Sequence, residues 1–370
     1  MTKQELSTHA IVLAGGRGTR FWPRSRTRTP KQLLNIVGKT TMFEQTVARL
    51  RPLLPADHIW SVTNAEQAVA LRKQLPAAAR HRVLTEPVGR NTAAAIALAA
   101  IHVRHAVQGD ALLAVLPADH YIARPENYRE IVRAALQLAR EPERMVVLGI
   151  PPTRPDTGFG YIEKMGEPLQ VDGCPVYAVR RFTEKPQLEM AKEYVASGNY
   201  QWNAGMFFWR VSTFLAALKK YLPKTHDALE ALAPHIGKRS YAAKLKRIYG
   251  KLENISVDYA MLEHATREHG ASQVFVIPAD IGWSDLGSWA AVYELVAKQP
   301  GENVLAGDGH TIDAEGNFLW SPDKFIVAIG VRDLVVVDTP DALLICPRER
   351  AQDVGKIVKT LEAKKRKKLL

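Results

Sequence analysis

The sequence predicts an α/β fold with a mixed, mainly parallel sheet flanked by helices, followed by a small β-rich C-terminal domain. Short apolar runs alternate with helix-like segments through roughly the first 290 residues, which is the pattern of a parallel sheet covered by helices. The last seventy residues instead contain short apolar runs separated by Gly, Asp and Pro turns. A chain of 370 residues, 46% of them hydrophobic, can bury one large core and a smaller one.

Strands and helices alternate in the first 150 residues. The apolar runs predict strands at Ala10–Leu13, His58–Thr63, Arg82–Thr85, Ala111–Leu116 and Met145–Gly149. Helices are expected at Met42–Arg51, Ala65–Gln74, Thr92–Val107 and Asn127–Arg140. The helix from Thr92 has the clearest pattern, because Ala and Leu, which are strong helix formers, fill its first turns.

The pattern becomes mixed after about residue 150. Strands are expected at Tyr161–Lys164, Val176–Phe182, Ala204–Trp209 and Gln273–Ile277, and helices at Leu188–Ser197, Val211–Tyr221 and Asp258–Glu268. The C-terminal strands are expected at Val304–Leu305, Phe318–Trp320, Phe325–Ile329, Leu334–Val337 and Ala342–Cys346, before a helix at Arg348–Lys364. Because Gln299-Pro300-Gly301 interrupts the pattern, we expect a larger α/β domain over 1–295 and a strand-rich domain over 300–370.

A glycine-rich loop follows the first predicted strand and contains Gly15, Gly16 and Gly18, with Lys31 further along. Glycines let a backbone approach a ligand and aim its N–H groups at one point, and Arg and Lys supply the charge that a polyphosphate needs. The P-loop pattern fails, since Gly18 is followed by Thr-Arg, and the dinucleotide pattern lacks its third glycine. A plain turn is the alternative to a phosphate cradle.

Two acidic residues follow short apolar runs. Asp119 ends Leu-Ala-Val-Leu-Pro-Ala-Asp, and Asp285 lies in Trp-Ser-Asp-Leu-Gly-Ser-Trp. Ligands of open α/β sheets bind at the carboxyl ends of strands, and carboxylates there can hold Mg²⁺. The alternative is that each acid caps a turn or the helix that follows it.

Two further segments contain polar side chains that could bind a ligand. Glu184 and Lys185 stand before a proline, where they could bind sugar hydroxyls and a phosphate or form a weak surface ion pair. Glu86 precedes the alanine-rich helix. Asn91 or Thr92 is expected to cap that helix.

The charge and the cysteines limit the class of protein. The net charge is +12, and the run Lys364–Lys368, which contributes five of these charges, is expected to be a solvated, frayed terminus that binds neither nucleic acid nor lipid. The remaining excess suits an enzyme with anionic substrates. Two cysteines, an N-terminus without a secretory signal and the absence of a membrane-length apolar run predict a cytoplasmic protein.

The stretch from Leu13 to Gln32 follows L-A-G-G-x-G-T-R-x-W-P-x-S-R-x-x-x-P-K-Q, and it resembles the opening of the nucleotidyltransferases that make nucleoside-diphosphate sugars. Its particular residues are similar to those of the bacterial mannose-1-phosphate guanylyltransferase family. The segments P-A-D-H, W-S-D-L-G-S-W, F-x-E-K-P, W-N-A-G-M-F and E-P-x-x-R-N-T-A extend the similarity over nearly the whole chain. The resemblance implies a Rossmann-like sheet and a β-helix-like C-terminal domain that helps homodimer formation.

The resemblance also implies a reaction, in which GMP passes from GTP to α-D-mannose 1-phosphate with Mg²⁺ as cofactor. The implied catalytic residues are Arg20 and Lys31, and the implied metal ligands are Asp119 and Asp285. The nucleotide would contact Leu13, Ala14, Gly15, Gly16, Gly18, Thr19, Glu86, Asn91 and Thr92, and the sugar phosphate would contact Gly160, Glu184, Lys185 and Asn203. A related enzyme for another sugar 1-phosphate and a non-catalytic regulatory homologue remain the alternatives.

Overall fold

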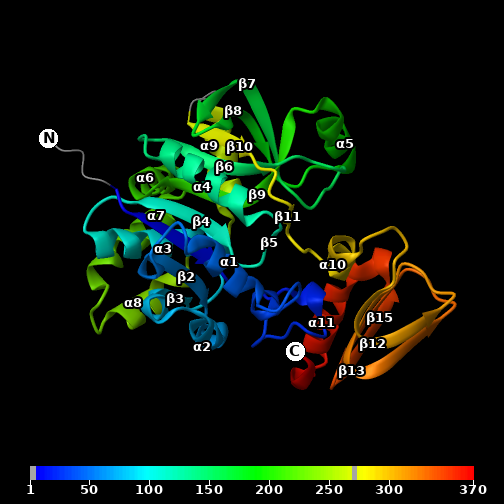
Figure 1. Cartoon of the computed structure of the whole chain (residues 1–370). Helices are drawn as coiled ribbons and strands as arrows, with labels where there is room; N and C mark the ends of the chain where they lie inside the picture. Colours follow the sequence, from blue (N-terminus) through cyan, green and yellow to red (C-terminus); the bar gives the residue numbers. More distant parts are fainter. Residues whose placement is uncertain (1–5, 269–272) are drawn as a thin grey trace.

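The computed structural model describes residues 6–268 and 273–370, and its centre is a nine-stranded sheet (Figure 1). Its strands are β1 (Thr8–Leu13), β2 (Ile59–Asn64), β3 (Val83–Glu86), β4 (Leu112–Pro117), β6 (Met145–Ile150), β7 (Tyr161–Val171), β8 (Cys174–Thr183), β9 (Tyr200–Arg210) and β10 (Val274–Pro278). They lie in the order β3-β2-β1-β4-β9-β6-β10-β8-β7. The mixed, mainly parallel sheet that the sequence predicts is therefore confirmed.

One antiparallel strand in the middle of the sheet determines where the polar strand ends meet. The pairs β3–β2, β2–β1, β1–β4 and β6–β10 are parallel, whereas β9 runs antiparallel to both β4 and β6. The beginning of β9 consequently lies at the carboxyl end of β6, where Asn203 pairs with Gly149. β7 starts at the same place, since Tyr161 pairs with Trp202. Chain segments that are far apart in sequence thus converge on one edge of the sheet.

Helices cover both faces of the sheet, because alternate side chains of each buried strand point to opposite faces. In β1, Ile11 packs in one core cluster while Val12 packs in the other. One face is covered by α3 (Asn91–Val107), α6 (Val211–Tyr221), α7 (Pro223–Glu230), α8 (Tyr241–Tyr249) and α9 (Glu263–Glu268); the other is covered by α1 (Met42–Leu50), α2 (Ala65–Gln74), α4 (Pro125–Ala139) and α5 (Leu188–Ser197). No helix in the described ranges is long and apolar enough to cross a lipid bilayer.

The C-terminal part is a four-stranded sheet of β12 (Val304–Ile312), β13 (Phe318–Ile329), β14 (Leu334–Thr339) and β15 (Ala342–Pro347). The two strands expected at 318–320 and 325–329 form the single strand β13, because it stays in parallel register with β12 across a bulge between Gly307 and Gly309. A side chain at Gly307 would lie 2.0 Å from the carbonyl oxygen of Ser321, so only glycine allows this close approach.

The helical expectations also need some correction. The helix expected at Arg348–Lys364 is a 3₁₀ turn over Arg348–Asp353 followed by α11 (Val354–Ala363), and a further 3₁₀ turn covers Lys367–Leu369. The sequence did not predict α7, α8 or α10 (Trp289–Val296). A short two-stranded sheet pairs β5 (Tyr121–Ile122) with β11 (Trp283–Ser284) and joins the segments that carry the two predicted metal ligands.

Trp289 joins the C-terminal sheet to the N-terminal glycine-rich segment. Its side chain is fully buried, and its ring lies 5.0 Å from that of Phe21 and 5.6 Å from that of Phe318. Its indole Nε1 donates to the carbonyl oxygen of Trp22 at 3.2 Å. One residue thus connects three parts of the chain through apolar contact and a satisfied polar group.

We expect Trp289→Ala to lower the free energy of unfolding by about 3–5 kcal/mol, because it leaves a cavity among aromatic rings. Chemical denaturation would measure this loss. Val69→Ala serves as the control, because Val69 is 62% exposed on α2 and its change should have little effect. A loss for Trp289→Ala no larger than for the control would contradict this role.

Candidate active site

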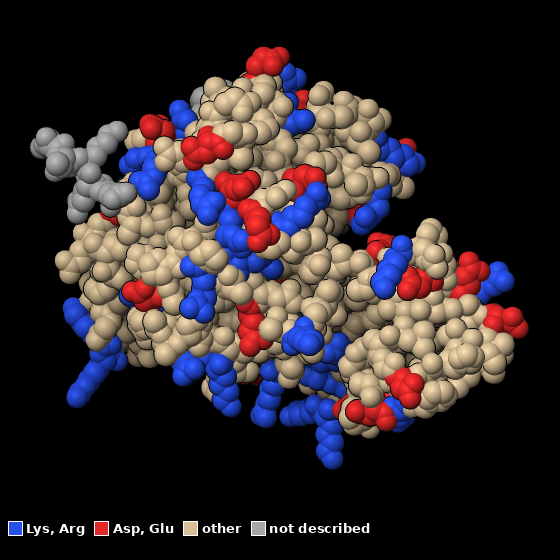
Figure 2. All heavy atoms as spheres, in the orientation of Figure 1, with Lys and Arg blue, Asp and Glu red and all other residues tan. Residues whose placement is uncertain are grey.

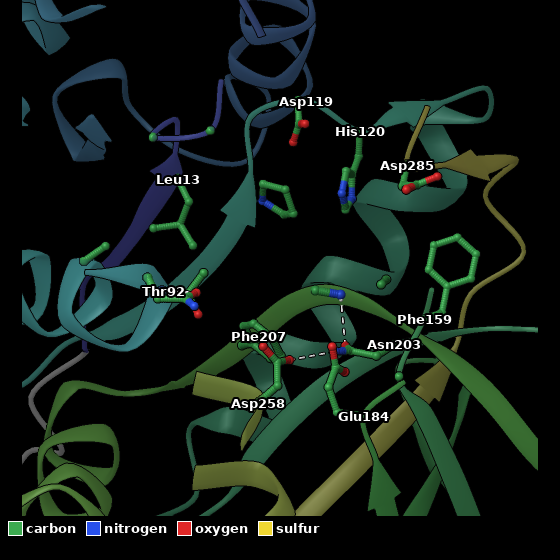
Figure 3. A pocket seen from close by; sticks show the side chains of 18 of the residues that line it. Leu13, Thr92, Asp119, His120, Phe159, Glu184, Asn203, Phe207, Asp258 and Asp285 are labelled. Atoms are coloured by element: carbon green, nitrogen blue, oxygen red, sulfur yellow. Dashed lines mark hydrogen bonds between the residues drawn. The ribbon is translucent and has the colours of Figure 1, made fainter. Parts of the chain in front are cut away.

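A cavity of about 510 Å³ opens at the sheet edge where β1, β3 and β4 end and β9 begins (Figure 3). Many of the residues predicted to bind substrates line it: Leu13, Gly15, Gly16, Glu86, Asn91, Thr92, Asp119, Gly160, Glu184, Asn203 and Asp285. Others predicted from the sequence do not line it: Ala14, Gly18, Thr19, Arg20, Lys31 and Lys185. Thr19 instead lines a separate small hollow together with Trp22 and Val358. The fold therefore brings residues from both halves of the α/β domain around one space.

The glycine-rich loop is held by its carbonyl groups. The buried amide of Gln32 donates to the carbonyl oxygens of Ala14 at 2.8 Å and Gly16 at 2.9 Å, and Gln67 accepts a third bond from it at 3.0 Å. Within the described residues, the backbone N–H groups of Gly15 and Gly16 donate to no other residue. Because its carbonyl groups are hydrogen-bonded and its N–H groups are unpaired, this loop can bind an anion through its backbone.

Lys31 connects this loop region to both strand-end acids. Its side chain is buried, and its Nζ donates to Oδ2 of Asp119 at 2.8 Å and to the backbone carbonyl oxygen of Asp285. Gly18, with φ of 60°, packs directly on Lys31, and a Cβ there would lie 2.2 Å from the Lys31 Cβ. Glycine at position 18 is therefore needed for both its backbone conformation and its contact with the lysine.

Asp119 is kept ionised by its surroundings. Burial alone would raise the pKa of its carboxyl, but the Lys31 ammonium and nearby His120 outweigh burial and lower that pKa. Asp285 makes no side-chain hydrogen bond with another residue in the described ranges, although it lines the same cavity. Neither acid caps a helix: Ser288 occupies the N-cap position of α10, and Asp119 is paired with Lys31.

The two acids suit Mg²⁺ in chemistry. Magnesium prefers oxygen ligands, and it is usually held by one or two carboxylates together with substrate phosphates and water. Asp119 and Asp285 supply these oxygens on the same rim of the cavity as His120 (Figure 3). Among the described residues, no group of three or more His, Cys, Asp or Glu forms a preassembled metal cage, so a metal here would depend on the substrate for further ligands.

Arg20 lies beside the acid-bearing loop and not inside the cavity. Its Nη1 donates to the carbonyl oxygen of Gly287 at 3.1 Å and to Oε1 of Gln352 at 2.9 Å. Its other guanidinium nitrogens make no hydrogen bond within the part of the chain that the structure describes. Arg20 is thus held beside Gly287 with donors to spare.

The C-terminal segment fixes the outer part of the glycine-rich region. Arg17 pairs with Glu362 of α11 at 2.6 Å, and the carbonyl oxygen of Leu369 accepts from Trp22 at 2.9 Å and from Arg26 at 2.6 Å. Figure 1 shows this N-terminal segment beside α11. The basic tail was expected to be frayed, but its backbone is docked here while its Lys side chains remain exposed.

The opposite wall contains the start of α3. Glu86 is buried, its Oε1 accepts from the Tyr249 hydroxyl at 2.8 Å, and burial raises the pKa of its carboxyl. Neither Asn91 nor Thr92 caps the helix as expected, because α3 has no side-chain cap. The Thr92 Oγ1 instead accepts from the backbone N–H of Val257 at 2.9 Å. The Asn91 amide oxygen accepts from the N–H of Thr92 at 2.9 Å.

The predicted sugar residues lie together on the remaining wall. Asn203 accepts from the Gly205 N–H at 2.9 Å, and Glu184 forms an ion pair with the exposed Lys185. A Cβ at Gly160 would lie 2.4 Å from Oε2 of Glu184, so glycine leaves the room that this carboxylate occupies. Asn203 and Glu184 lie side by side in Figure 3.

The structure adds cavity residues that the sequence did not single out as ligand-binding. Asp258 at the start of a π-helical turn, His120, Phe159 and Trp283 all line the cavity. The Trp283 indole N–H donates to Nδ1 of His120 at 3.1 Å, and burial lowers the pKa of this histidine. A local sequence pattern could have drawn attention to His120, which follows Asp119, but not to Asp258, which comes near only through the fold.

A phosphate-type loop, a buried lysine and two carboxylates at one sheet edge define an enzyme that handles a nucleoside phosphate. Comparison agrees, because the nucleotidyl transferase family model matches residues 9–301 and the MannoseP isomerase/GMP-like beta-helix domain model matches 308–361. The chain belongs to the nucleotidyl transferase family, and it is an enzyme of that class.

The chain is also similar to individual proteins of this family. Mannose-1-phosphate guanylyltransferase of Escherichia coli K12 is 38% identical over 366 residues, covering 96% of this chain and 73% of its own. Alginate biosynthesis protein AlgA of Pseudomonas aeruginosa is 37% identical, covering 96% and 72%. The crystal structure of a protein named mannose-1-phosphate geranyltransferase from Thermus thermophilus superimposes with a TM-score of 0.85 at 34% identity, covering 96% of this chain and all of that one.

The hydrogen bonds of Gln32 lead to a testable expectation. Gln32→Leu keeps a similar volume but removes the donors that hold Ala14 and Gly16. We expect the affinity for GTP to fall about tenfold, because a lost hydrogen bond costs about 1 kcal/mol and the loop loses its fixed shape. Titration calorimetry would measure this change, with Gln170→Leu at an exposed site as control. An unchanged affinity for GTP in Gln32→Leu would contradict the role of the glycine-rich loop in binding phosphate.

Proposed function

We propose that this enzyme transfers GMP from GTP to α-D-mannose 1-phosphate, releasing pyrophosphate and forming GDP-mannose. One observation supports this most strongly: the cavity has a phosphate-type loop on one side of Asp119 and Asp285 and a carboxylate–amide wall on the other. That division suits two phosphorylated substrates meeting near the acids. The name of the relative that is 38% identical agrees with this reaction.

In the proposed reaction, a phosphate oxygen of mannose 1-phosphate attacks the α-phosphorus of GTP, and the bond to the β-phosphate oxygen breaks. Pyrophosphate leaves opposite to the attacking oxygen and carries away the electron pair. Mg²⁺ bound at Asp119 and Asp285 would neutralise phosphate charge. The free N–H groups of Gly15 and Gly16 bind the nucleotide phosphates. No covalent enzyme intermediate is needed, because positioning and charge neutralisation suffice.

The two cationic residues have different parts in this proposal. Lys31 is buried and holds Asp119, so its ammonium can stabilise charge only near the acids. Arg20 is exposed beside Gly287 and has free donors, so it can bind the leaving pyrophosphate. On the other side, Glu184 and Asn203 orient the sugar, and Lys185 binds its phosphate.

A pyrophosphate-release assay tests this function. The purified chain would be supplied with Mg²⁺, one of GTP, ATP, UTP or dTTP, and one of mannose, glucose or a heptose 1-phosphate. We expect the fastest turnover with GTP and mannose 1-phosphate. Preference for another pair would identify a related enzyme of the same family, and no turnover with any pair would indicate a regulatory homologue.

The proposed metal site predicts the effects of two substitutions. Asp285→Asn should lower kcat at least 100-fold with little change in stability, because its carboxylate has no other partner in the described ranges. Asp119→Asn should also lower kcat, but it removes the charge that pairs with Lys31 and should therefore cost stability as well. Chelation with EDTA should abolish turnover, and added Mg²⁺ should restore it.

The control for both acids is Asp308→Asn, which changes an exposed aspartate on β12. Steady-state kinetics at saturating Mg²⁺ would give kcat, and thermal unfolding would report stability. Near-normal kcat in Asp285→Asn, or full activity in EDTA, would show that the metal assignment is wrong.

The C-terminal sheet supports the proposal of a homodimer. Phe325, Val327 and Ile329 are 64%, 50% and 62% exposed at alternate positions of β13, and Ile312 lies beside Ile329 in register. A contiguous apolar patch of this kind marks an interaction surface, and a second copy needs only this one patch to form a two-fold contact. Light scattering should give a dimer for the wild type and a monomer for Phe325→Glu. Leu169→Glu on β7 is the control, and a monomeric wild type would contradict the proposal.

We also propose that the enzyme works in the cytosol. Cys174 and Cys346 are free thiols, which suits a reducing compartment. Lys and Arg outnumber Asp and Glu along the lower edge of the molecular face in Figure 2, in keeping with the net charge of +12 and with anionic substrates. Nothing in this proposal calls for a nucleic acid or a lipid.

A further inference from the structure

Asp258 supplies the cavity with a carboxylate that the mechanism above does not use. Asp258 begins the π-helical turn Asp258–Leu262 and lines the cavity on the wall opposite Asp119 and Asp285 (Figure 3). π-Helical turns are rare and frequently occur at functional sites. The residue is half-buried and thus open to a ligand.

The neighbours of Asp258 are the residues proposed to bind the sugar. Its Oδ1 accepts from Nδ2 of Asn203 at 2.7 Å. Its Oδ2 makes no hydrogen bond with another residue in the described ranges, which leaves an oxygen free toward the cavity. Burial, followed by the neighbouring Glu184 carboxylate, raises the pKa of Asp258 to about 6. Two carboxylates thus face the same part of the cavity.

The backbone before Asp258 is hydrogen-bonded to the start of α3, which forms one wall of the cavity. The N–H of Val257 donates to Oγ1 of Thr92 at 2.9 Å, and the carbonyl oxygen of Ile255 accepts from the N–H of Ala93 at 3.3 Å. Asp258 is therefore held between the start of α3 and Asn203. Preorganisation of this kind lets a side chain discriminate between ligands without moving.

We propose that Asp258 is a specificity-determining residue that hydrogen-bonds a hydroxyl of the sugar 1-phosphate, together with Glu184 and Asn203. This inference rests on the proposed function. A hexose presents several hydroxyls at fixed angles, and Glu184 alone can bind only one neighbouring pair. Asp258 supplies an acceptor from a different direction, so that a change in the orientation of one hydroxyl leaves a polar group unpaired. Sites built in this way reject the wrong isomer strongly.

The test uses Asp258→Asn, which is close in size and still offers Oδ1 to Asn203. We expect the KM for mannose 1-phosphate to rise about 10- to 100-fold, since a hydrogen bond to a charged group is lost. The affinity for GTP measured by calorimetry should stay within about twofold. The ratio of kcat/KM for mannose 1-phosphate to that for glucose 1-phosphate should fall at least tenfold. Asp308→Asn serves as the matched control and should change none of these values.

A purely structural role would give a different result. If Asp258→Asn lowered thermal stability and GTP affinity together and left the ratio between the two sugars unchanged, the inference would be wrong. An unchanged KM and ratio would also overturn it. Asp258→Glu keeps the charge but moves the carboxylate by one methylene, and it too should alter the sugar ratio while leaving GTP affinity intact.

The proposed function and this inference can fail separately. If the wild type prefers another sugar 1-phosphate, the proposed function is wrong, and the same variants are then measured with that sugar and its epimer. A rise in KM and a changed ratio would still support the role of Asp258. If the wild type prefers mannose 1-phosphate and the variants behave like the control, only the inference about Asp258 fails.

Discussion

The contact of Lys31 with Asp119 and with the backbone of Asp285 is the constraint on which the site depends. Three segments that are far apart in the sequence meet at one buried ammonium group. Removing the lysine would leave the Asp119 carboxylate, whose side chain is 34% exposed, without its charged partner and without the hydrogen bond that fixes it. The pair is thus a means of fixing geometry, since exchanging both ions for apolar residues would cost little stability but would lose the site.

The same contact explains the residues around it. Gly18 must be glycine because Lys31 packs against its Cα, and the adjacent Gln32 holds the carbonyls of the glycine-rich loop. The loop, the lysine and the acids therefore form one unit. On the far side, the insertion of β9 antiparallel between β4 and β6 brings Asn203 to the same edge, and Asp258 is fixed against it. The cavity lies between these two sets of residues.

The C-terminal segment extends this unit outward. Arg17, Arg20 and Trp22 all bond to residues beyond position 350. The buried Trp289 also links the two parts, because its ring contacts Phe21 in the glycine-rich region and Phe318 in the C-terminal sheet. The outer half of the glycine-rich region is thus held by the C-terminal part, while its inner half is held by Gln32. A change in the C-terminal part can reach the nucleotide loop without any contact with substrate.

The sequence by itself determined the α/β class, most strand positions, and the loop, acid and glutamate–lysine motifs, because periodic apolar runs and short motifs are local properties of a chain. It could not supply α7 and α8, the continuity of β13 or the docking of the basic tail, since these depend on partners distant in sequence. Asn91 or Thr92 was expected to cap α3, but Thr92 instead accepts from the N–H of Val257, and Asp258 was expected only as the first residue of a helix. Only the tertiary structure decided these roles, because long-range hydrogen bonds and burial, which no short window contains, fix each side chain in place.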